Sequence, residues 1–290
     1  MNPPVSAASA APAEPAEDED QGAGALQRTE WRVRDGAWNT GSAALAVEAP
    51  IALQFNGIAH AVMLATPRDL EDFALGFSLS EGILASAAEL YSVEVQRTGP
   101  GHTLALEIGA AAFARLKDRR RTLAGRTGCG ICGTESLDQV LRPLAPLPPA
   151  HGLLAPAALA KAAAALPAAQ ALQRATGATH GAAWCALDGS IVALREDVGR
   201  HNALDKLIGA LVRTHVDRGA GFALITSRAS VEMVQKAASA GIALLAAVSA
   251  PTSLALEVAE RCGLTLIGFA RGNQFSVYSH RERLLGADAA

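Results

Sequence analysis

The chain has 290 residues, of which 50% are apolar and 18% are charged, so it can bury one large core or two smaller ones. Its net charge is −3, and without the acidic stretch that precedes Arg28 the charge is close to zero, which argues against a general nucleic-acid binder. A run of about 18 strongly apolar residues is absent, so no membrane-spanning helix is expected.

The first 27 residues consist mainly of Ala, Pro and acidic residues, without the basic start and apolar stretch of a secretory signal. This composition cannot bury enough surface to offset the entropy of ordering, so residues 1–27 are predicted to form a disordered acidic tail. The four cysteines are unevenly spaced, which favours a reduced, cytoplasmic protein over a disulfide scaffold. They are Cys129, Cys132, Cys185 and Cys262.

The next segment is predicted to form a small α/β domain over residues 28–124. Short strands are expected at residues 44–47, 50–55, 59–64, 93–95 and 104–108. Asn56-Gly57 is typical of a tight hairpin turn. Thr66 and Pro67 favour the N-cap and first position of a helix that continues to Gly82.

A basic stretch leads into a glycine-rich Cys-x-x-Cys sequence, and a proline-rich stretch follows. We predict that residues 125–155 form a mobile loop and linker. The alanine-rich residues 159–172 favour a helix that is broken or kinked at Pro167.

Residues 156–290 are predicted to form a second α/β domain. Strands are expected at residues 190–194, 222–225, 242–248 and 264–269, the last ending at Phe269. Helices are expected from Asn202 as N-cap, from about Ser230, and from Thr252 to Cys262. Apolar strands that alternate with helices indicate a parallel sheet with helices covering it.

The pair Cys129 and Cys132 admits four interpretations. A thioredoxin-like redox motif would open a helix, whereas glycines at 128, 130 and 133 indicate a loop here. A structural zinc site needs two further ligands at similar spacing. The pair could also be an inert turn, or a nucleophilic, sulfur-handling thiol on a mobile arm. Nearby arginines favour the last interpretation because they stabilise a thiolate, although they could equally form a solvated face.

Four segments together resemble the FdhD family of formate dehydrogenase accessory sulfurtransferases. They are residues 124–133 (AGRTGCGICG), residues 65–82 (ATPRDLEDFALGFSLSEG), residues 196–206 (EDVGRHNALDK) and residues 227–230 (SRAS). The resemblance implies a fold with a cytidine-deaminase-like C-terminal domain. It also implies a sulfur carrier that takes persulfide sulfur from a cysteine desulfurase. The sulfur then goes to the bis(molybdopterin guanine dinucleotide) molybdenum cofactor before this cofactor enters formate dehydrogenase.

Residue by residue, the resemblance places the persulfide on Cys129, with Cys132 as its companion. It places the cofactor-binding stretch on Phe269, Ala270, Arg271, Gly272, Asn273 and Gln274. A homodimer is expected, without a resident metal and without nucleic-acid or membrane partners. The alternative is a non-catalytic cofactor-binding chaperone whose cysteines only regulate it; a zinc-stabilised binding module is a more distant possibility.

Independently of the resemblance, three loops are expected at the carboxyl edge of the sheet, where ligands bind in open α/β folds. They are residues 226–228, 249–253 and 270–273. His180 and His201 could line the same cleft or be structural. Deamination is not expected, because a zinc deaminase needs a glutamate two residues after the histidine, where this chain has Ala182 after His180.

Overall fold

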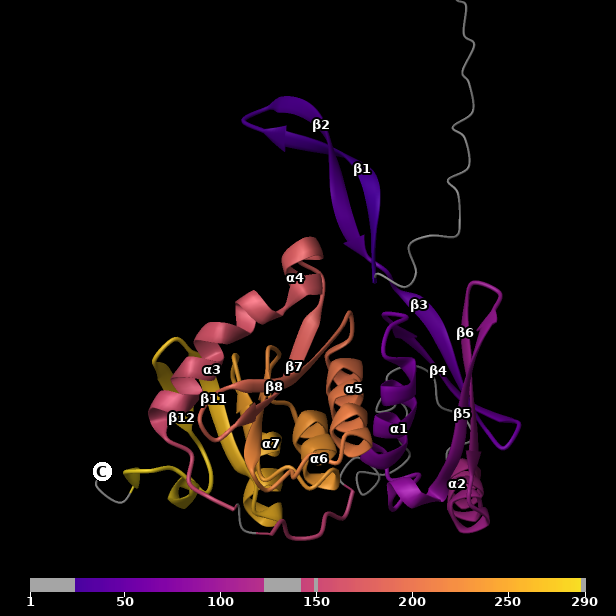
Figure 1. Ribbon diagram of the computed structural model, residues 1–290, viewed down its shortest axis with the longest axis vertical. Coiled ribbons are helices and arrows are strands. Elements are labelled where there is room, and N and C mark those ends of the chain that lie inside the picture. Colours follow the sequence, from indigo (N-terminus) through magenta and orange to yellow (C-terminus); the bar gives the residue numbers. More distant parts are fainter. Residues whose placement is uncertain (1–23, 123–141, 149–150, 288–290) are drawn as a thin grey trace, which may run out of the picture.

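A computed structural model describes residues 24–122, 142–148 and 151–287 of the chain. These residues form two halves that pack side by side, with a long hairpin standing above them (Figure 1). Residues 1–23 of the predicted tail lie outside the described residues. Its last three residues, 25–27, belong to strand β1. Most of the Cys-x-x-Cys loop also lies outside them, because residues 123–141 are not described.

The sequence analysis predicted only residues 44–47 of the protruding hairpin, and it also missed helix α2 and strand β7, which are described below. Strands β1 (Ala25–Arg34) and β2 (Ala37–Ala46) pair antiparallel along their whole length. Asp35 and Gly36 join them with φ values of 51° and 80°, the left-handed pair that a tight hairpin turn requires. The Asp-Gly dipeptide was therefore the available sequence signal.

The N-terminal half is built on a four-stranded sheet with the order β4-β3-β6-β5. The strands are β3 (Ala49–Phe55), β4 (Ile58–Ala65), β5 (Leu90–Thr98) and β6 (Gly101–Ile108). The predicted turn at Asn56 and Gly57 is confirmed, since both residues have positive φ and join β3 to β4. Helices α1 (Leu70–Ser80) and α2 (Ala110–Thr122) contribute to the apolar core of this half, and a short 3-10 helix spans Ala87–Glu89.

The predicted start of α1 is wrong by three residues. The helix begins at Leu70 with Asp69 as N-cap, rather than at Pro67 with Thr66 as N-cap. Thr66 cannot cap the helix because its polar groups bind the other half of the protein. Its N–H donates to Asp197 Oδ2 at 3.0 Å, and its hydroxyl accepts from Val198 N–H at 3.2 Å.

The C-terminal half is built on a six-stranded sheet with the order β12-β11-β10-β9-β7-β8. The strands are β7 (His180–Ala186), β8 (Ile191–Asp197), β9 (Gly221–Ile225), β10 (Leu244–Ala247), β11 (Thr265–Arg271) and β12 (Gln274–Val277). The predicted parallel pairing is right for β9, β10 and β11. It is wrong for the predicted strand at residues 190–194, because β8 pairs only with the antiparallel β7. The sheet is mixed, since β7 and β12, which were not predicted, both run antiparallel to their neighbours; the β7–β8 and β11–β12 pairs are hairpins, in which a tight turn enforces antiparallel pairing.

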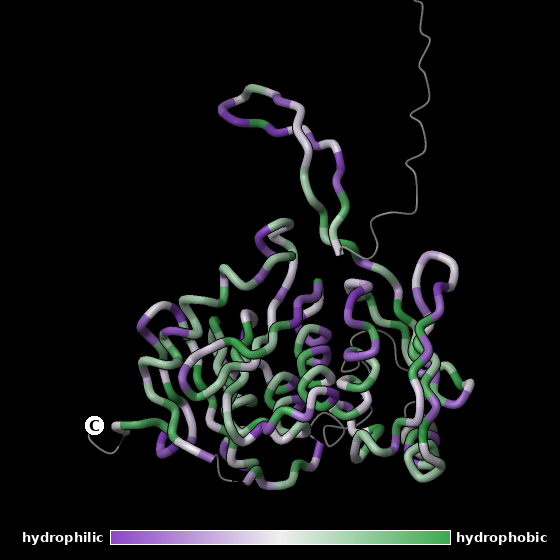
Figure 2. The backbone as a smooth tube through the Cα atoms, in the orientation of Figure 1, coloured by the Kyte–Doolittle hydropathy of each residue, from purple (hydrophilic) through white to green (hydrophobic). Residues whose placement is uncertain are grey.

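Helices cover both faces of this sheet and complete a three-layer arrangement (Figure 1). Helix α3 (Pro156–Ala169) covers one face, and α5 (Arg200–Arg213), α6 (Val231–Ser239) and α7 (Ser253–Cys262) cover the other. Apolar segments concentrate between these layers (Figure 2). The remaining helices are α4 (Ala171–Thr176) and a 3-10 helix at Arg281–Arg283. The mixed α/β class is confirmed, whereas the likeness to cytidine deaminases stays a prediction.

Two predicted helix boundaries need correction. Pro167 lies inside α3, and the chain breaks at Gln170 instead. Helix α5 begins after Gly199, so Asn202 is inside the helix rather than its N-cap. The side-chain amide of Asn202 links the two halves instead, because its Nδ2 donates a hydrogen bond to Leu64 O at 2.8 Å.

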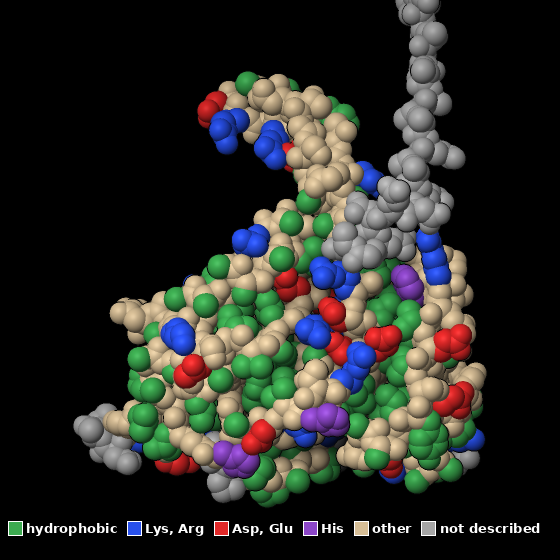
Figure 3. Space-filling model, in the orientation of Figure 1, with side chains coloured by type: hydrophobic (Ala, Val, Ile, Leu, Met, Phe, Trp, Pro, Cys, Tyr) green, Lys and Arg blue, Asp and Glu red, His purple; other side chains and the backbone are tan. Residues whose placement is uncertain are grey.

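The two halves meet where α1 packs against α5. A Cβ on Gly76 would lie 1.7 Å from Asp205 O, and one on Gly209 would lie 1.9 Å from Asp72 O, so only glycines allow this approach. Acidic and basic side chains are interspersed on the surface over this junction (Figure 3). Among them, Asp72 binds Arg195 at 2.7 Å across the halves.

The described part of the predicted linker packs on the C-terminal half. Leu147 N–H donates to Cys262 O at 2.8 Å, and Leu154 is fully buried in the core beneath α3. Leu144, Leu147 and Leu154 thus pack in the apolar cores of this half, whereas the mobility of the linker stays a prediction. Within the described ranges, no helix is long and apolar enough to cross a membrane.

Candidate functional site

The carboxyl edge of β9, β10 and β11 brings the three expected loops together. Ala229 N–H donates to Ala250 O at 3.2 Å, which joins the loop after β9 to the loop after β10. Phe269 N–H donates to Ser249 O at 3.1 Å, which joins the loop after β10 to β11. The three segments thus form one continuous rim, as expected for parallel strands that end at the same edge.

Phe269 is the most unusual residue of this rim. It does not end β11, which continues to Arg271 through an irregularity in register after Gly268. Its φ is 55°, a conformation that bulky residues rarely adopt, and its side chain is 46% exposed. Phe269 is therefore not a core residue. The bulge directs the aromatic ring into solvent, and the backbone there is strained. Both features are typical of a functional position.

The other expected cofactor-binding residues form a hairpin rather than a loop leaving the sheet. Gly272 and Asn273 make the turn, and Gln274 begins β12 opposite Arg271. All four residues from 271 to 274 are exposed, whereas Ala270 is 1% exposed and packs in the core. Only the backbone of Ala270 can therefore contact a ligand. Arg271 Nε donates to Val248 O at 2.9 Å, which directs the guanidinium along the rim.

Two histidines extend this edge. His180 begins β7 and lies 3.5 Å from Thr226 Oγ1 through its Nδ1. Burial, with Arg200 and His201 nearby, lowers the pKa of His180 below its usual value. His201 lies on the first turn of α5, with its Nε2 3.6 Å from Glu232 Oε2. The His201 ring lowers the pKa of Glu232 to about 2.

Two of the four cysteines lie within the described residues, and both are buried. Cys185 and Cys262 are 0% and 2% exposed, and burial raises the pKa of both thiols, that of Cys185 to about 12. Such thiols are poor nucleophiles because the thiolate is the reactive form. Cys129 and Cys132 lie outside the described residues.

Arg142 is the first residue that the structure describes after residues 123–141, and it lies beside this site. Arg142 N–H donates to Gln235 Oε1 at 2.8 Å on α6, and its guanidinium donates to Ser80 O at 2.6 Å at the end of α1. The guanidinium also lies 3.5 Å from Glu81. Burial opposes ionisation of Glu81, but Lys236 and Arg142 outweigh it and lower the pKa of Glu81 to about 2. Arg142, the first described residue after the two cysteines, is thus held between α6 and the end of α1.

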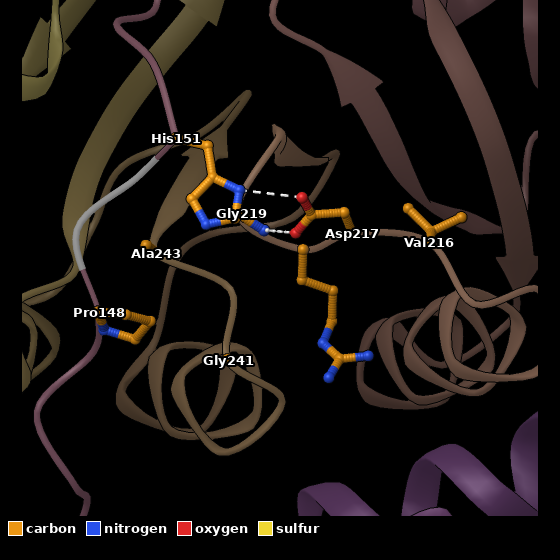
Figure 4. Close-up of a pocket in the computed structure, with 8 residues that line it drawn as sticks. Pro148, His151, Val216, Asp217, Gly219, Gly241 and Ala243 are labelled. Atoms are coloured by element: carbon orange, nitrogen blue, oxygen red, sulfur yellow. Dashed lines mark hydrogen bonds and ion pairs between the residues drawn. The ribbon is translucent and has the colours of Figure 1, made fainter.

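A cavity of about 290 Å³ lies at the opposite edge of the sheet (Figure 4). His151 Nδ1 lies 2.9 Å from Asp217 Oδ2 there, and both side chains are more than half exposed. This cavity is remote from the rim and does not belong to the candidate site. Among the described residues, no group of three or more His, Cys, Asp or Glu side chains could hold a metal ion.

Comparison with known proteins identifies the family. A model of the FdhD/NarQ family matches residues 46–285. The chain belongs to this family. Its relatives include proteins named sulfur carrier protein FdhD from Variovorax paradoxus (strain S110) and Cupriavidus necator. The first is 59% identical over 84% of this chain and 88% of the relative, and the second is 56% identical over 83% of each.

The FdhD/NarQ fold is also seen in a solved structure. A crystal structure of a formate dehydrogenase accessory protein from Desulfotalea psychrophila superposes with a TM-score of 0.70 at 25% identity. It covers 90% of this chain and 99% of its own. The family resemblance of the four sequence segments is therefore confirmed, and so is the mixed α/β architecture.

The sequence analysis did not single out Gln170 and Gln173, which line a cavity beside His180. Their only signal in the sequence was that polar residues end an alanine-rich helix.

Proposed function

We propose that this protein is a sulfur carrier for formate dehydrogenase maturation. It accepts persulfide sulfur on Cys129 from a cysteine desulfurase and passes it to the bis(molybdopterin guanine dinucleotide) molybdenum cofactor, which is its cargo. The loaded cofactor then enters formate dehydrogenase. The names of the relatives support the carrier role, and the division of the cysteines supports the site. The expected homodimer and cytoplasmic location stay predictions.

The single observation that carries the site assignment is the burial of Cys185 and Cys262. In transfer from a desulfurase, a thiolate attacks the outer sulfur of the donor persulfide, and the donor cysteine leaves as a thiolate. Such an attack requires access and a pKa near the ambient pH, and the two buried thiols offer neither. Cys129 and Cys132 are the remaining candidates.

The anchor at Arg142 supports delivery to the carboxyl edge. Cys132 precedes Arg142 by ten positions in the sequence, a length of chain that spans at most about 34 Å. From residue 142 the chain runs past α6 to Leu147 at the end of α7 and to His151 at the opposite edge. Cys132 is therefore within about 34 Å of Arg142, whose contacts with Gln235 and Ser80 lie between α6 and the end of α1.

The rim supplies the groups that a dinucleotide cargo needs. Phe269 presents an exposed ring for stacking on a heterocycle, and Arg271 presents a guanidinium that can bind a phosphate. Gly272 has an open position with φ of 56°, so a ligand can approach its backbone closely. In this proposal the rim holds the cofactor while the cysteine segment brings the sulfur.

The test is incubation of the full chain with a cysteine desulfurase and cysteine, followed by intact-protein mass spectrometry. An added sulfur atom is expected in the native chain and in Cys185→Ala, which serves as the matched control, but not in Cys129→Ala. Persulfide on Cys185 or Cys262 would overturn the assignment. Absence of any adduct, with cofactor binding retained, would favour the non-catalytic chaperone instead.

A further inference from the structure

The carboxyl edge of the C-terminal sheet extends beyond the rim to the junction between the two halves. Thr226 Oγ1, just after β9, accepts from Gly181 N–H of β7 at 3.0 Å, and His180 is paired with Asp197 at the end of β8. Asp197 in turn accepts from the N–H of Thr66, in the N-terminal half, at 3.0 Å. The rim and the residues that lead into α1 therefore lie along one continuous edge.

Four arginines lie along this edge, each within three residues of the end of a strand. Arg68 follows β4, Arg200 follows β8 as the first residue of α5, and Arg228 follows β9. Arg271 ends β11. Arg68, Arg228 and Arg271 are exposed, and Arg200 is partly buried. We refer to these four residues as the arginine edge.

The acidic side chains near the arginine edge have partners of their own. These pairs are Asp69 with Arg195, Glu196 with the N–H groups of Leu172 and Gln173, Asp197 with Lys206, and Glu232 with His201 and Ser230. The positive end of the α5 macrodipole also lies at this edge, since the helix begins at Arg200. The edge thus has a positive potential that suits a negatively charged segment or ligand.

The acidic part of the chain joins the fold at this same edge. Gly24, the first described residue, is buried, and a Cβ on it would lie 2.6 Å from Arg68 Cδ and 3.4 Å from Thr66 Cγ2. The hairpin that follows Gly24 stands above the end of the molecule where α4 leads into β7 (Figure 1). Residues 14–20 hold five acidic side chains and no basic one, namely Glu14, Glu17, Asp18, Glu19 and Asp20. They precede residues 46–285, which match the family model, so they are an addition to the family fold.

The length of chain before Gly24 is sufficient to bring these acids onto the arginine edge. Asp20 precedes Gly24 by four positions and Glu14 precedes it by ten, so they lie within about 14 Å and about 34 Å of it. Strands β8 and β11 are four strand spacings apart, which is about 19 Å. The acids can therefore reach every arginine from Arg68 to Arg271. Carboxylates pair with guanidinium groups through two parallel hydrogen bonds, so the two sets are complementary in chemistry as well as in charge.

We propose that the acidic segment of residues 14–20 binds the arginine edge and covers it until an anionic ligand displaces it. The segment is attached to the fold, so its effective concentration at the edge is in the millimolar range. A ligand must therefore carry enough negative charge, as a nucleoside diphosphate does, to compete for the same arginines. The regulatory role rests on the proposed function, because that function places an anionic cargo at this edge. The contact between segment and edge does not depend on it.

The direct test measures binding of a fluorescein-labelled peptide of residues 12–22 to a full-length neutral-tail variant. This variant carries Glu14→Gln, Glu17→Gln, Asp18→Asn, Glu19→Gln and Asp20→Asn. Fluorescence anisotropy at an ionic strength of about 0.01 M, where charges interact over about 30 Å, is expected to show saturable binding that GDP reverses. The native chain should bind the peptide at least about threefold more weakly, because its own segment occupies the edge. A peptide with the same five substitutions is the matched control and should not bind.

Calorimetric titration with GDP measures the competition. The neutral-tail variant is expected to bind GDP about three- to tenfold more tightly than the native chain at about 0.01 M salt, and this ratio should approach one at about 1 M salt. Arg68→Gln in the native chain is expected to strengthen GDP binding, because it loosens the segment. A general field effect would do the opposite, since the substitution removes a positive charge. Arg261→Gln, at the end of α7 away from this edge, is the control and should leave the affinity for GDP unchanged.

Three results overturn the inference: equal GDP affinities of the native chain and the neutral-tail variant at low salt, weaker GDP binding after Arg68→Gln, or equal binding of the two peptides. Thermal unfolding shows whether each variant is folded. Saturable peptide binding without any binding of GDP supports the contact between segment and edge, but it rejects the role of this edge in holding the cargo, which belongs to the proposed function.

Discussion

Lys206 Nζ and Asp197 Oδ2 lie 2.6 Å apart, and neither side chain is exposed at all. The pair also binds the first residue after β4, because Lys206 Nζ donates to Thr66 O at 2.8 Å and Asp197 accepts from Thr66 N–H at 3.0 Å. Burial lowers the pKa of Lys206, although Asp197 opposes this shift. One buried ion pair therefore joins the N-terminal sheet to the C-terminal half.

Lys206→Met is expected to lower the free energy of unfolding by about 3–5 kcal/mol, because it leaves Asp197 buried without its counter-ion. Chemical denaturation measures the change. Lys161→Met is the matched control: its ammonium lies 3.7 Å from Asp188 on the surface, where a pair contributes about 0–1 kcal/mol. Equal effects of the two substitutions would contradict a joining role for the buried pair.

Gly76→Ala is expected to lower the melting temperature strongly, because the new Cβ would collide with the Asp205 carbonyl and force α1 away from α5. Gly41→Ala on β2 is the control, since a Cβ there makes only an ordinary contact at 3.4 Å with Glu30. Differential scanning calorimetry compares the two. If Gly76→Ala unfolded at the native temperature, the close helix contact would not contribute to stability.

Stability is expected to fall in acid partly through Glu232. His201 lowers the folded-state pKa of Glu232 from 4.5 to about 2, so its contribution is complete above pH 4.5 and is lost as the pH falls towards 2. Glu232→Gln should therefore make the free energy of unfolding less dependent on pH between these values. Denaturation series at several pH values test this, and parallel curves for the two proteins would contradict it.

Cys129→Ala is expected to abolish activation of formate dehydrogenase, because the sulfur needs a thiolate that both donor and acceptor can reach. Cys132→Ala should have a smaller effect if Cys132 relays or protects the sulfur. The measurement is formate dehydrogenase activity in cells that carry each variant as their only copy. Native activation by both variants would reject the persulfide mechanism.

Arg271→Ala is expected to weaken binding of GDP, a stand-in for half of the cofactor, by at least about tenfold. A hydrogen bond to a charged group contributes roughly 1.5–3 kcal/mol, which sets this scale. Arg261→Ala removes the same charge from the exposed end of α7, and calorimetry should show native affinity for it. Unchanged affinity in Arg271→Ala would remove the hairpin from the site.

Local patterns in the sequence were sufficient for many elements of this fold. Asn56-Gly57 identified the β3–β4 turn because only left-handed residues fit it, and Ser230 and Thr252 marked the starts of α6 and α7. The strand predicted at residues 264–269 corresponds to β11, but its continuation through the bulge to Arg271 was not predicted. A bulge depends on how the neighbouring strand is paired, which the local sequence does not encode.

By itself, the sequence determined the family, the cysteine pair and the elements that form the carboxyl edge, because these depend on residue type and short-range periodicity. Only the tertiary structure decided that Thr66 and Asn202 join the two halves rather than cap helices, since their partners lie more than 130 positions away in the chain. It also decided that Phe269 is exposed and that Gln170 faces a cavity with His180. Burial and hydrogen bonding over such separations arise when the sheets and helices pack, so no local pattern can contain them.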